Sequence, residues 1–315
     1  MDALRGVAVL LVVLLHVPVL PTLLGDAPPE WLERTQFALQ PYRMPTLLFL
    51  SGMLLEQSLR KGVRRYLTGK VEGIVWPWVV WTVITTVALR EVTALLSPRT
   101  WVLGYHHLWF LTILAGCYVL GLLTRKVPLW VFPIVLAVVA ILGVAFGLDG
   151  VPGGEMVLRF CWWSSFFFLG AAARFWLPRW QEVTGAAPVV LGLVVVAWSV
   201  WVVLTPEARL SRSVPAYLLS VAGVLLLLWV APRISWPEWL QVVGRNSIVW
   251  YLAHYPAIGF TWLFLRDLGV SSWWVALPLL AVVGYLVPLL LVPFARTPLF
   301  RWSLNRPPVL TGQNG

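Results

Sequence analysis

Charged residues are scarce in this chain of 315 residues. They make up 11% of it, whereas a soluble globular chain carries about 25%. Hydrophobic residues account for 60%. A soluble protein of this size needs much more polar surface to cover its core, so soluble enzymes and disordered chains are both excluded. The composition indicates a polytopic membrane protein.

Cysteine is almost absent, and so are metal and nucleotide motifs. Cys117 and Cys161 both fall inside apolar runs, so we interpret them as packing residues rather than a disulfide or metal pair. There is no H-E-x-x-H motif, carboxylate cluster, phosphate-binding glycine motif or G-x-S-x-G elbow. We therefore predict no metal site and no permanently bound cofactor.

Apolar runs of about twenty residues, the length of a membrane-spanning helix, recur along the whole chain. We predict an all-α fold of about ten transmembrane helices forming one integral-membrane domain over residues 1–315. The first run lacks a basic start and a small-residue cleavage site, so we do not expect a removable signal peptide. The expected spans are residues 3–24, 41–59, 73–90, 107–124, 127–146, 158–177, 186–205, 213–231, 246–265 and 273–295.

Lysine is rare, with 3 residues against 20 arginines, and the net charge is +10. The basic residues lie at the ends of apolar runs, which is typical of membrane proteins, so we expect no nucleic-acid partner. If the N-terminus is placed inside, 15 of the 23 basic residues but only 5 of the 13 acidic ones fall on the inner face. The positive-inside rule therefore predicts that both termini are cytoplasmic.

The chain has only four histidines, and all lie in or at the edge of an expected span. Ionisable residues inside a membrane are costly and often mark functional sites. They are His16, His106, His107 and His254.

The first expected helix carries Asp2, Arg5 and His16. His16 lies eleven positions after Arg5. In an α-helix, eleven positions bring a residue to within about 20° of the same face after a rise of about 16 Å. We therefore predict a polar stripe from the cytoplasmic mouth to beyond mid-membrane. Asp2 has the spacing to pair with Arg5. For Asp2 and Arg5 the alternative is an interfacial ion pair. For His16 it is a core histidine bonded to a neighbouring carbonyl.

The ninth expected helix repeats this pattern. Ser247, Tyr251 and His254 fall on one helical face. Asn246 or Ser247 is placed to cap the helix start, and Pro256 is expected to kink it just after His254. His254 lies about 12 Å into the membrane by helical rise, near the depth of His16. A hydrogen-bonded packing stripe is the alternative.

Two further segments place polar residues at the outer edge of the membrane. Arg43 opens the second expected helix, in which the Ser51–Gly52 pair allows another backbone to come close. His107 opens the fourth expected helix within "YHHLWFL". Aromatic residues are common at membrane interfaces, so an anchoring role is the alternative for this second segment.

The densest basic segment is "RKGVRRYLTGK", which we expect to be a cytoplasmic loop. One interpretation is a plain positive-inside loop. The other is a binding site for a polyanion such as a nucleotide phosphate. The residues of this basic cluster that we expect to bind are Arg60, Lys61, Arg64 and Arg65.

Together these residues resemble the integral-membrane acyltransferase-3 family, the bacterial O-acetyl and O-acyl transferases of sugars and glycans. The resemblance covers nearly the whole chain, and five short motifs occur in the family's order. They are Asp2, Arg5 and His16; Arg43, Pro45, Ser51 and Gly52; the basic stretch Arg60 to Arg65; His107 to Leu111; and Asn246, Ser247, Tyr251 and His254.

The resemblance implies acyl transfer from cytoplasmic acyl-CoA, usually acetyl-CoA, to a hydroxyl of an extracytoplasmic glycan or lipid-linked sugar. It implies the cytoplasmic membrane of a bacterium, with membrane lipid, acyl-CoA and the glycan acceptor as partners. The histidine matching His16 is taken as catalytic in the family. Many members carry an additional SGNH-type hydrolase domain. This chain resembles a stand-alone member, for which we expect direct delivery to the acceptor.

A charged donor cannot cross about 30 Å of hydrocarbon, so we predict a polar passage lined by Arg5, His16 and His254. The expected catalytic residues are Asp2, Arg5 and His16. His16 is expected to act as general base or as nucleophile, and the basic cluster to hold the phosphates of acyl-CoA. A transporter or flippase without chemistry, and a membrane scaffold or sensor, are the rival functions. The residues expected at the acceptor and oxyanion side are Arg43, His107, Asn246, Ser247, Tyr251 and His254.

Overall fold

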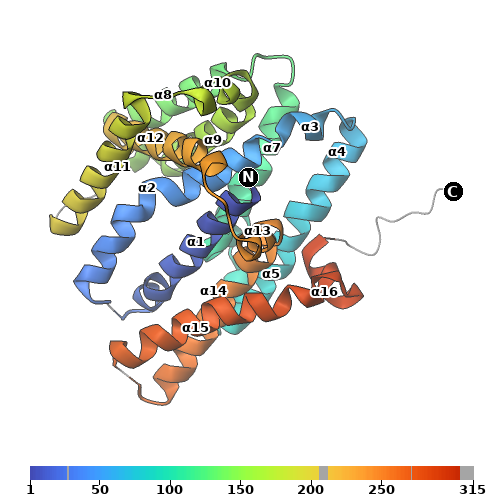
Figure 1. Cartoon of the computed structure of the whole chain (residues 1–315). Helices are drawn as coiled ribbons and strands as arrows, with labels where there is room; N and C mark the ends of the chain where they lie inside the picture. The colour runs from blue at the N-terminus through green and yellow to red at the C-terminus, as the bar shows by residue number, and fades with distance from the viewer. Residues whose placement is uncertain (27, 206–211, 271, 306–315) are drawn as a thin grey trace. The chain divides into compact units, whose positions relative to one another are not determined.

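A computed structural model describes residues 1–26, 28–205, 212–270 and 272–305. All regular structure in these ranges is helical, with no strand among them, which confirms the predicted all-α class (Figure 1). Within these described ranges, eight helical runs are long and apolar enough to cross a membrane, and each overlaps one of the ten expected spans. The chain is therefore a multi-pass membrane protein.

The helices follow one another with short connections. The α-helices are α1 (Asp2–Leu23), α2 (Glu30–Gly52), α3 (Leu55–Leu59), α4 (Val63–Lys70), α5 (Trp76–Ala88), α6 (Pro98–Leu103), α7 (Trp109–Leu123), α8 (Val131–Ala145), α9 (Gly154–Ala171), α10 (Leu177–Glu182), α11 (Ala186–Leu204), α12 (Val214–Val230), α13 (Glu238–Arg245), α14 (Ser247–Asp267), α15 (Trp273–Leu291) and α16 (Pro298–Asn305). A π-helical turn, η1 (Val71–Val75), joins α4 to α5, and the 3-10 turns are η2 (Val92–Leu96), η3 (His106–Leu108), η4 (Leu148–Gly150), η5 (Ala173–Phe175), η6 (Ala231–Arg233) and η7 (Pro293–Arg296).

Two expected spans have different bounds in the structure. The span expected over 41–59 is helix α2, which begins at Glu30 because Pro29 precedes the first turn and Glu30 and Glu33 favour the helix start. It ends at Gly52, and a turn separates it from α3. The span expected over 127–146 is α8, which has only 15 residues.

The loop expected over the basic cluster is also corrected. From Val63 the chain is helical, and α4, η1 and α5 form one run to Ala88. Tyr66 explains why, because its buried side chain donates a hydrogen bond of 2.7 Å to the carbonyl of Tyr118 and anchors α4. Arg64 and Arg65 are therefore helical residues.

The chain divides into two compact units, each built from three segments. The first unit comprises Met1–Val9, Pro29–Arg60 and Val119–Arg245, and the second comprises Leu10–Pro28, Lys61–Tyr118 and Asn246–Gly315. Each unit thus collects helices that are distant in sequence. The single domain expected over residues 1–315 stays a prediction.

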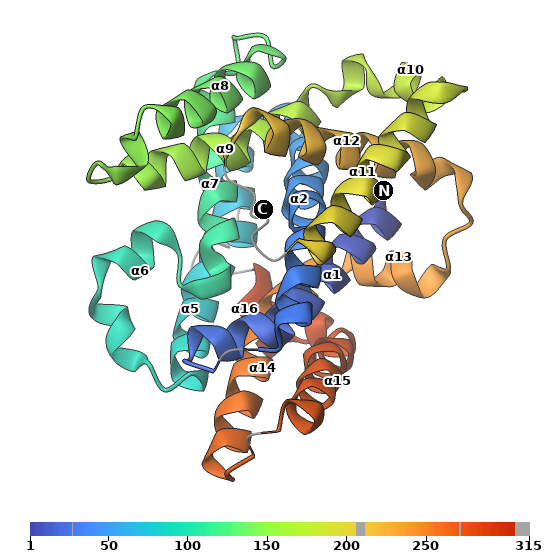
Figure 2. The ribbon, with the colours of Figure 1, turned by 90° about the vertical axis from the view of Figure 1, so that its left-hand side faces the viewer.

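In the first unit, α9 packs against both α8 and α2 (Figures 1 and 2). The contact with α2 depends on two glycines, because a Cβ at Gly52 would collide with the carbonyl of Phe167, and one at Gly170 with the carbonyl of Phe49. The close backbone approach predicted at Gly52 is therefore confirmed.

We expect Gly170→Ala to destabilise the protein by about 1–3 kcal/mol, the usual cost of overpacking, because the new methyl group meets backbone on α2. Thermal unfolding of the purified protein, followed by size exclusion, measures the effect. Gly192→Ala in α11 is the matched control, since its nearest neighbouring atom is 4.0 Å away. Equal melting of the two variants would show that α2 and α9 do not need this contact.

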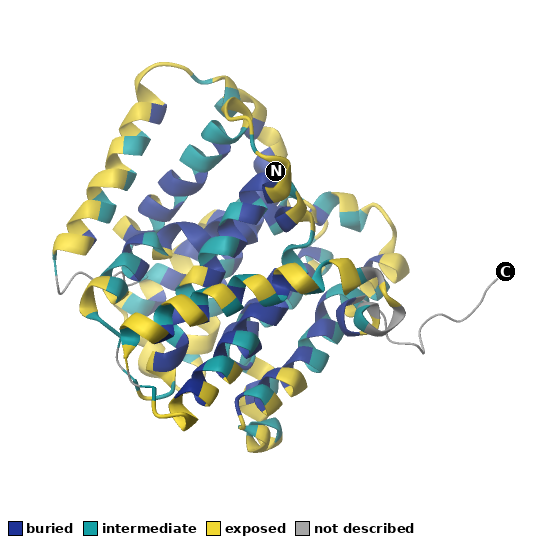
Figure 3. Cartoon of the chain, turned by 60° about the horizontal axis from the view of Figure 1, so that its bottom comes forward, coloured by how far each residue is buried: buried dark blue, intermediate teal, exposed yellow. Residues whose placement is uncertain are grey.

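In the second unit, α14 packs against α15 and α5, and α16 packs against α5. The part of α1 from Leu10 onward belongs to the same unit. There Tyr285 on α15 donates a 3.0 Å hydrogen bond to the carbonyl of Leu10. Figure 3 shows exposed residues along one side of several helices, and the exposed residues of α11 and α15 include many valines and leucines. Such apolar faces are suited to lipid.

Candidate active site

The second unit brings three histidines together. His16 comes from α1, His107 from η3 and His254 from α14. The ring centroids of His16 and His254 are 5.0 Å apart, and that of His107 lies 5.5 Å from His254 and 6.3 Å from His16. His107 and His254 are buried, and His16 is half-buried. The similar depth predicted for His16 and His254 is confirmed by their contact.

Backbone carbonyls assign the protons of the His16–His254 pair. His254 Nδ1 lies 2.8 Å from the carbonyl of Trp250, so Nδ1 carries a hydrogen and Nε2 a lone pair. His16 Nδ1 lies 2.8 Å from the carbonyl of Val12 and 3.1 Å from His254 Nε2. Because both neighbours accept, His16 Nδ1 must be the donor.

The basic atom of His16 is therefore Nε2. A neutral imidazole has one donor and one acceptor nitrogen, and the partner of one nitrogen decides which role the other takes. His254 and the turn of α1 at Val12 thus hold His16 in the tautomer that a general base or a nucleophile requires. The carbonyl contact expected from the packing alternative is present, but it orients the ring as well.

Tyrosines from α14 complete this histidine cluster. The ring of Tyr255 stacks on His107 with centroids 4.4 Å apart and an interplanar angle of 12°. Tyr251 donates a hydrogen bond to the backbone carbonyl of His107. Both contacts fix η3 against α14. Among the described residues, neither ring nitrogen of His107 has a hydrogen-bond partner.

Next to this cluster lies an acidic group that sequence reasoning missed. Glu91 accepts a 2.6 Å hydrogen bond from the hydroxyl of Tyr105 and lies 3.7 Å from Nε2 of His106. Burial, and then the bond to Glu91, raise the pKa of the Tyr105 hydroxyl, which therefore stays a neutral donor. Arg90 and His106 have positive φ angles of 60° and 46°, a strained conformation often found at functional sites.

The ion pair predicted at the start of the chain is confirmed. Arg5 and Asp2, both in the first unit, lie 3.5 Å apart on α1. The polar stripe that we predict from Arg5 to His16 stays a prediction.

The start of α14 lies away from the cluster along the helix. Asn246 occupies the capping position, but its side chain makes no capping hydrogen bond. Ser247 precedes His254 by seven residues, about 10 Å of helical rise. Of the acceptor-side residues expected on this helix, only Tyr251 and His254 therefore reach the histidine cluster.

The basic cluster is exposed. Arg60, in the first unit, pairs with Glu56 at 2.8 Å. Lys61, Arg64 and Arg65, in the second unit, are exposed around the start of α4. Gly62, with a φ of 84°, leads into this helix, and no side chain caps it. Backbone N–H groups at such a start, together with two guanidinium groups, suit an anion.

Arg43 belongs to the first unit and is buried. Its guanidinium donates to the side-chain oxygen of Gln36 at 2.6 Å and to the Gln36 carbonyl at 2.9 Å. Both partners lie two turns earlier on α2. The guanidinium of Arg43 is thus held by uncharged oxygens of its own helix. The role predicted for Arg43 at the acceptor side stays a prediction.

Cys117 and Cys161 are buried and are not joined in a disulfide, which agrees with the packing role expected of them. Over the described ranges, no group of three or more histidine, cysteine, aspartate or glutamate side chains is arranged to hold a metal ion.

A family model, Acyl_transf_3, described as an acyltransferase domain, matches residues 1–293, which is most of the chain. Neither the curated proteins nor the solved structures include a significant match.

Proposed function

Because the chain belongs to the acyltransferase-3 family and is a membrane acyltransferase, we propose that it moves an acyl group, acetyl in the first instance, from cytoplasmic acyl-CoA. The acceptor is a hydroxyl of an extracytoplasmic glycan, lipid-linked sugar or glycosylated molecule, and the enzyme acts in the cytoplasmic membrane of a bacterium. The observation that carries this proposal is the contact between His16 and His254, which gives His16 a basic nitrogen.

His16 Nε2 takes the proton of the acceptor hydroxyl as its oxygen attacks the thioester carbonyl carbon. The carbon–sulfur bond then breaks, and the imidazolium returns the proton to the leaving sulfur. General base catalysis of this kind contributes about 10²–10⁴-fold in rate. The alternative is direct attack by Nε2, which forms an acyl-imidazole that the acceptor then cleaves.

His254 is proposed to position His16 rather than to stabilise the oxyanion. Its Nδ1–H is already donated to Trp250, and its Nε2 accepts. Tyr251 likewise donates its hydroxyl hydrogen to the carbonyl of His107. The ring N–H of His107, which lacks a partner among the described residues, is the better oxyanion donor.

The donor is proposed to bind at the start of α4. Two exposed arginines and the uncapped backbone N–H groups there suit the phosphates of coenzyme A. The acyl group itself must then reach His16 from the cytoplasmic side.

The proposed function is tested by mass spectrometry of surface glycans from cells that contain the gene and from cells that lack it. We expect a mass difference of one acyl group per modified sugar, which disappears with the gene. Identical glycan masses in the two strains would overturn the glycan acceptor.

The positioning role of His254 predicts a difference between two substitutions. His254→Leu removes one of the two acceptors for His16 Nδ1 and leaves the carbonyl of Val12. It should lower kcat about 10-fold, the lower end of the loss that removal of an orienting partner causes at metal-bound histidines. His254→Gln keeps an acceptor near the same place and should recover most of this loss. The KM for acyl-CoA should stay unchanged in both.

Steady-state kinetics of the purified variants over a range of pH measure this effect. The pH profile of His254→Leu should shift, because the carbonyl of Val12 alone then keeps the lone pair of His16 on Nε2. If His254→Gln loses as much kcat as His254→Leu, then packing rather than orientation explains the residue.

A further inference from the structure

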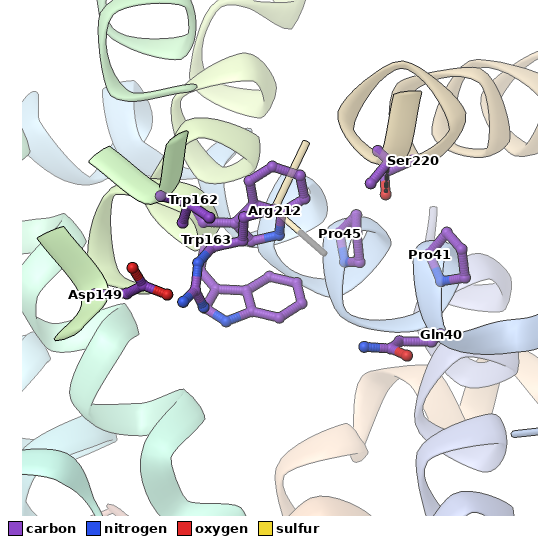
Figure 4. Close-up of a pocket in the computed structure, with 10 residues that line it drawn as sticks. Gln40, Pro41, Pro45, Asp149, Trp162, Trp163, Arg212 and Ser220 are labelled. Carbon is purple, nitrogen blue, oxygen red and sulfur yellow. Dashed lines mark hydrogen bonds between the residues drawn. The ribbon is translucent and has the colours of Figure 1, made fainter. Parts of the chain in front are cut away.

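The first unit contains a cavity that includes none of the residues given a catalytic or binding role above. Its volume is about 290 Å³, at the lower end of the range of about 300–1,000 Å³ for small-molecule sites. Figure 4 shows Asp149, Arg212 and the Trp162–Trp163 pair on one side, and Gln40, Pro41, Pro45 and Ser220 on the other. These residues come from α2, η4, α9, α12 and the segment before α12.

Polar groups of several kinds face this cavity. They include the carboxylate of Asp149, the guanidinium of Arg212 and the amide of Gln40. The hydroxyl of Ser220 donates to the carbonyl of Ala216 at 2.9 Å and can only accept from a ligand. Both donors and acceptors are thus available within one small space, together with two indole rings. A ligand with many hydroxyl groups and an apolar ring face uses all of these features.

The charges of the cavity favour a neutral ligand. Arg212 is held by Glu155, to which one guanidinium nitrogen donates at 3.1 Å and another at a shorter distance. Glu155 therefore neutralises the arginine, and Asp149 adds a negative charge beside it. A phosphate or carboxylate group would meet this excess of negative charge, whereas an uncharged sugar would not.

Glu155 fixes the guanidinium of Arg212 in place, but one of its N–H groups makes no hydrogen bond within the described ranges. Its Nε–H is buried and lacks a hydrogen-bond partner among the residues that the structure describes. Burying such a group without a partner costs about 1–3 kcal/mol.

The indoles have different roles. Trp162 is buried and packs edge-to-face against Phe166 and Tyr217, with centroids 5.9 and 5.6 Å away. It forms the rigid back of the cavity. Trp163 is half-buried, so it retains surface for a ligand.

The cavity lies on the acceptor side by the charge distribution of the chain. The segments that contain Gln40, Asp149 and Arg212 are all placed on the outer face by the positive-inside rule. Two further cavities among the described residues differ, because apolar residues line them almost completely. One lies along α11 and α12, and the other along α5, the end of α15 and α16. Those suit lipid chains.

We propose that this cavity binds a neutral sugar ring of the acceptor, with Trp163 against the ring face and Asp149, Arg212 and Gln40 hydrogen-bonded to its hydroxyls. The identification of the ligand as acceptor rests on the proposed function. The binding itself does not, because it needs neither donor nor catalysis.

The test uses the full chain in nanodiscs without acyl-CoA. Saturation-transfer NMR detects binding of methyl glycosides of glucose, galactose, mannose and N-acetylglucosamine. We expect binding of at least one of them to be at least tenfold weaker in Trp163→Leu and in Asp149→Asn than in wild type. Asp149 is exposed, so its substitution leaves the core intact.

Trp31→Leu and Glu30→Gln are the matched controls, since both residues are exposed at the start of α2 and do not line the cavity. Both should bind as wild type does. His16→Ala should also bind the glycoside, which separates this inference from the proposed catalysis. The inference is overturned if no glycoside binds wild type, if the cavity variants bind equally well, or if the controls lose binding to the same extent.

Discussion

His16→Ala is expected to lower the rate of acyl transfer by about 10²–10⁴-fold, the usual contribution of a positioned base. The substitution removes Nε2, which the contacts of Nδ1 with Val12 and His254 leave as the basic atom. A larger loss is expected if His16 is the nucleophile, because no covalent intermediate then forms.

The measurement is the rate of coenzyme A release and of acylated product, with purified protein at saturating acyl-CoA. Leu14→Ala on the same helix is the matched control, since Leu14 is exposed and lies outside the histidine cluster. It should keep wild-type activity. Activity of His16→Ala within threefold of wild type would remove His16 from the mechanism. Mass spectrometry of the quenched enzyme distinguishes the general-base mechanism from the nucleophilic one, because His16 carries an acyl group only in the nucleophilic mechanism.

The double variant Arg64→Gln and Arg65→Gln is expected to raise the apparent KM for acyl-CoA on the order of 100-fold, with kcat little changed. A charge-assisted hydrogen bond contributes about 1.5–3 kcal/mol, and 1.4 kcal/mol is a factor of ten. We expect the lower end for each arginine because both are exposed to solvent. High salt should weaken donor binding in wild type more than in the variant.

Arg125→Gln with Lys126→Gln is the matched control, because it removes two exposed basic residues from another inner segment. Its KM should equal that of wild type. If both double variants raise the KM for acyl-CoA equally, then the overall positive charge predicted for the inner face attracts the donor, and Arg64 and Arg65 form no specific site. If neither does, coenzyme A binds elsewhere.

Much of the fold follows from the sequence alone. Apolar runs are direct evidence of spanning helices, and the rise of an α-helix is enough to predict that His16 and His254 lie at similar depths. The spacing of Asp2 and Arg5 predicts their ion pair. These predictions succeed because each depends on residues that are close in the chain.

The features that the sequence does not reveal depend on contacts between distant segments. The segment around α4 has two glycines and many charges, which are typical of a loop, and only the bond from Tyr66 to Tyr118 shows why it is helical. Helix α2 begins at Glu30, before its apolar part, and apolar runs do not detect such a polar first turn. The tautomer of His16 depends on a residue 238 positions away. No periodicity in the sequence reports such pairings.

The central claim is that this chain transfers an acyl group from acyl-CoA by means of His16. The most direct measurement uses purified protein in lipid vesicles, supplied with [¹⁴C]acetyl-CoA and a membrane extract that contains acceptor. The account predicts radiolabel in glycan or lipid-linked sugar with wild type, and loss of at least about 99% of it with His16→Ala, the hundredfold lower limit for a lost base. Unlabelled glycan with wild type, or equal labelling by His16→Ala, would contradict it.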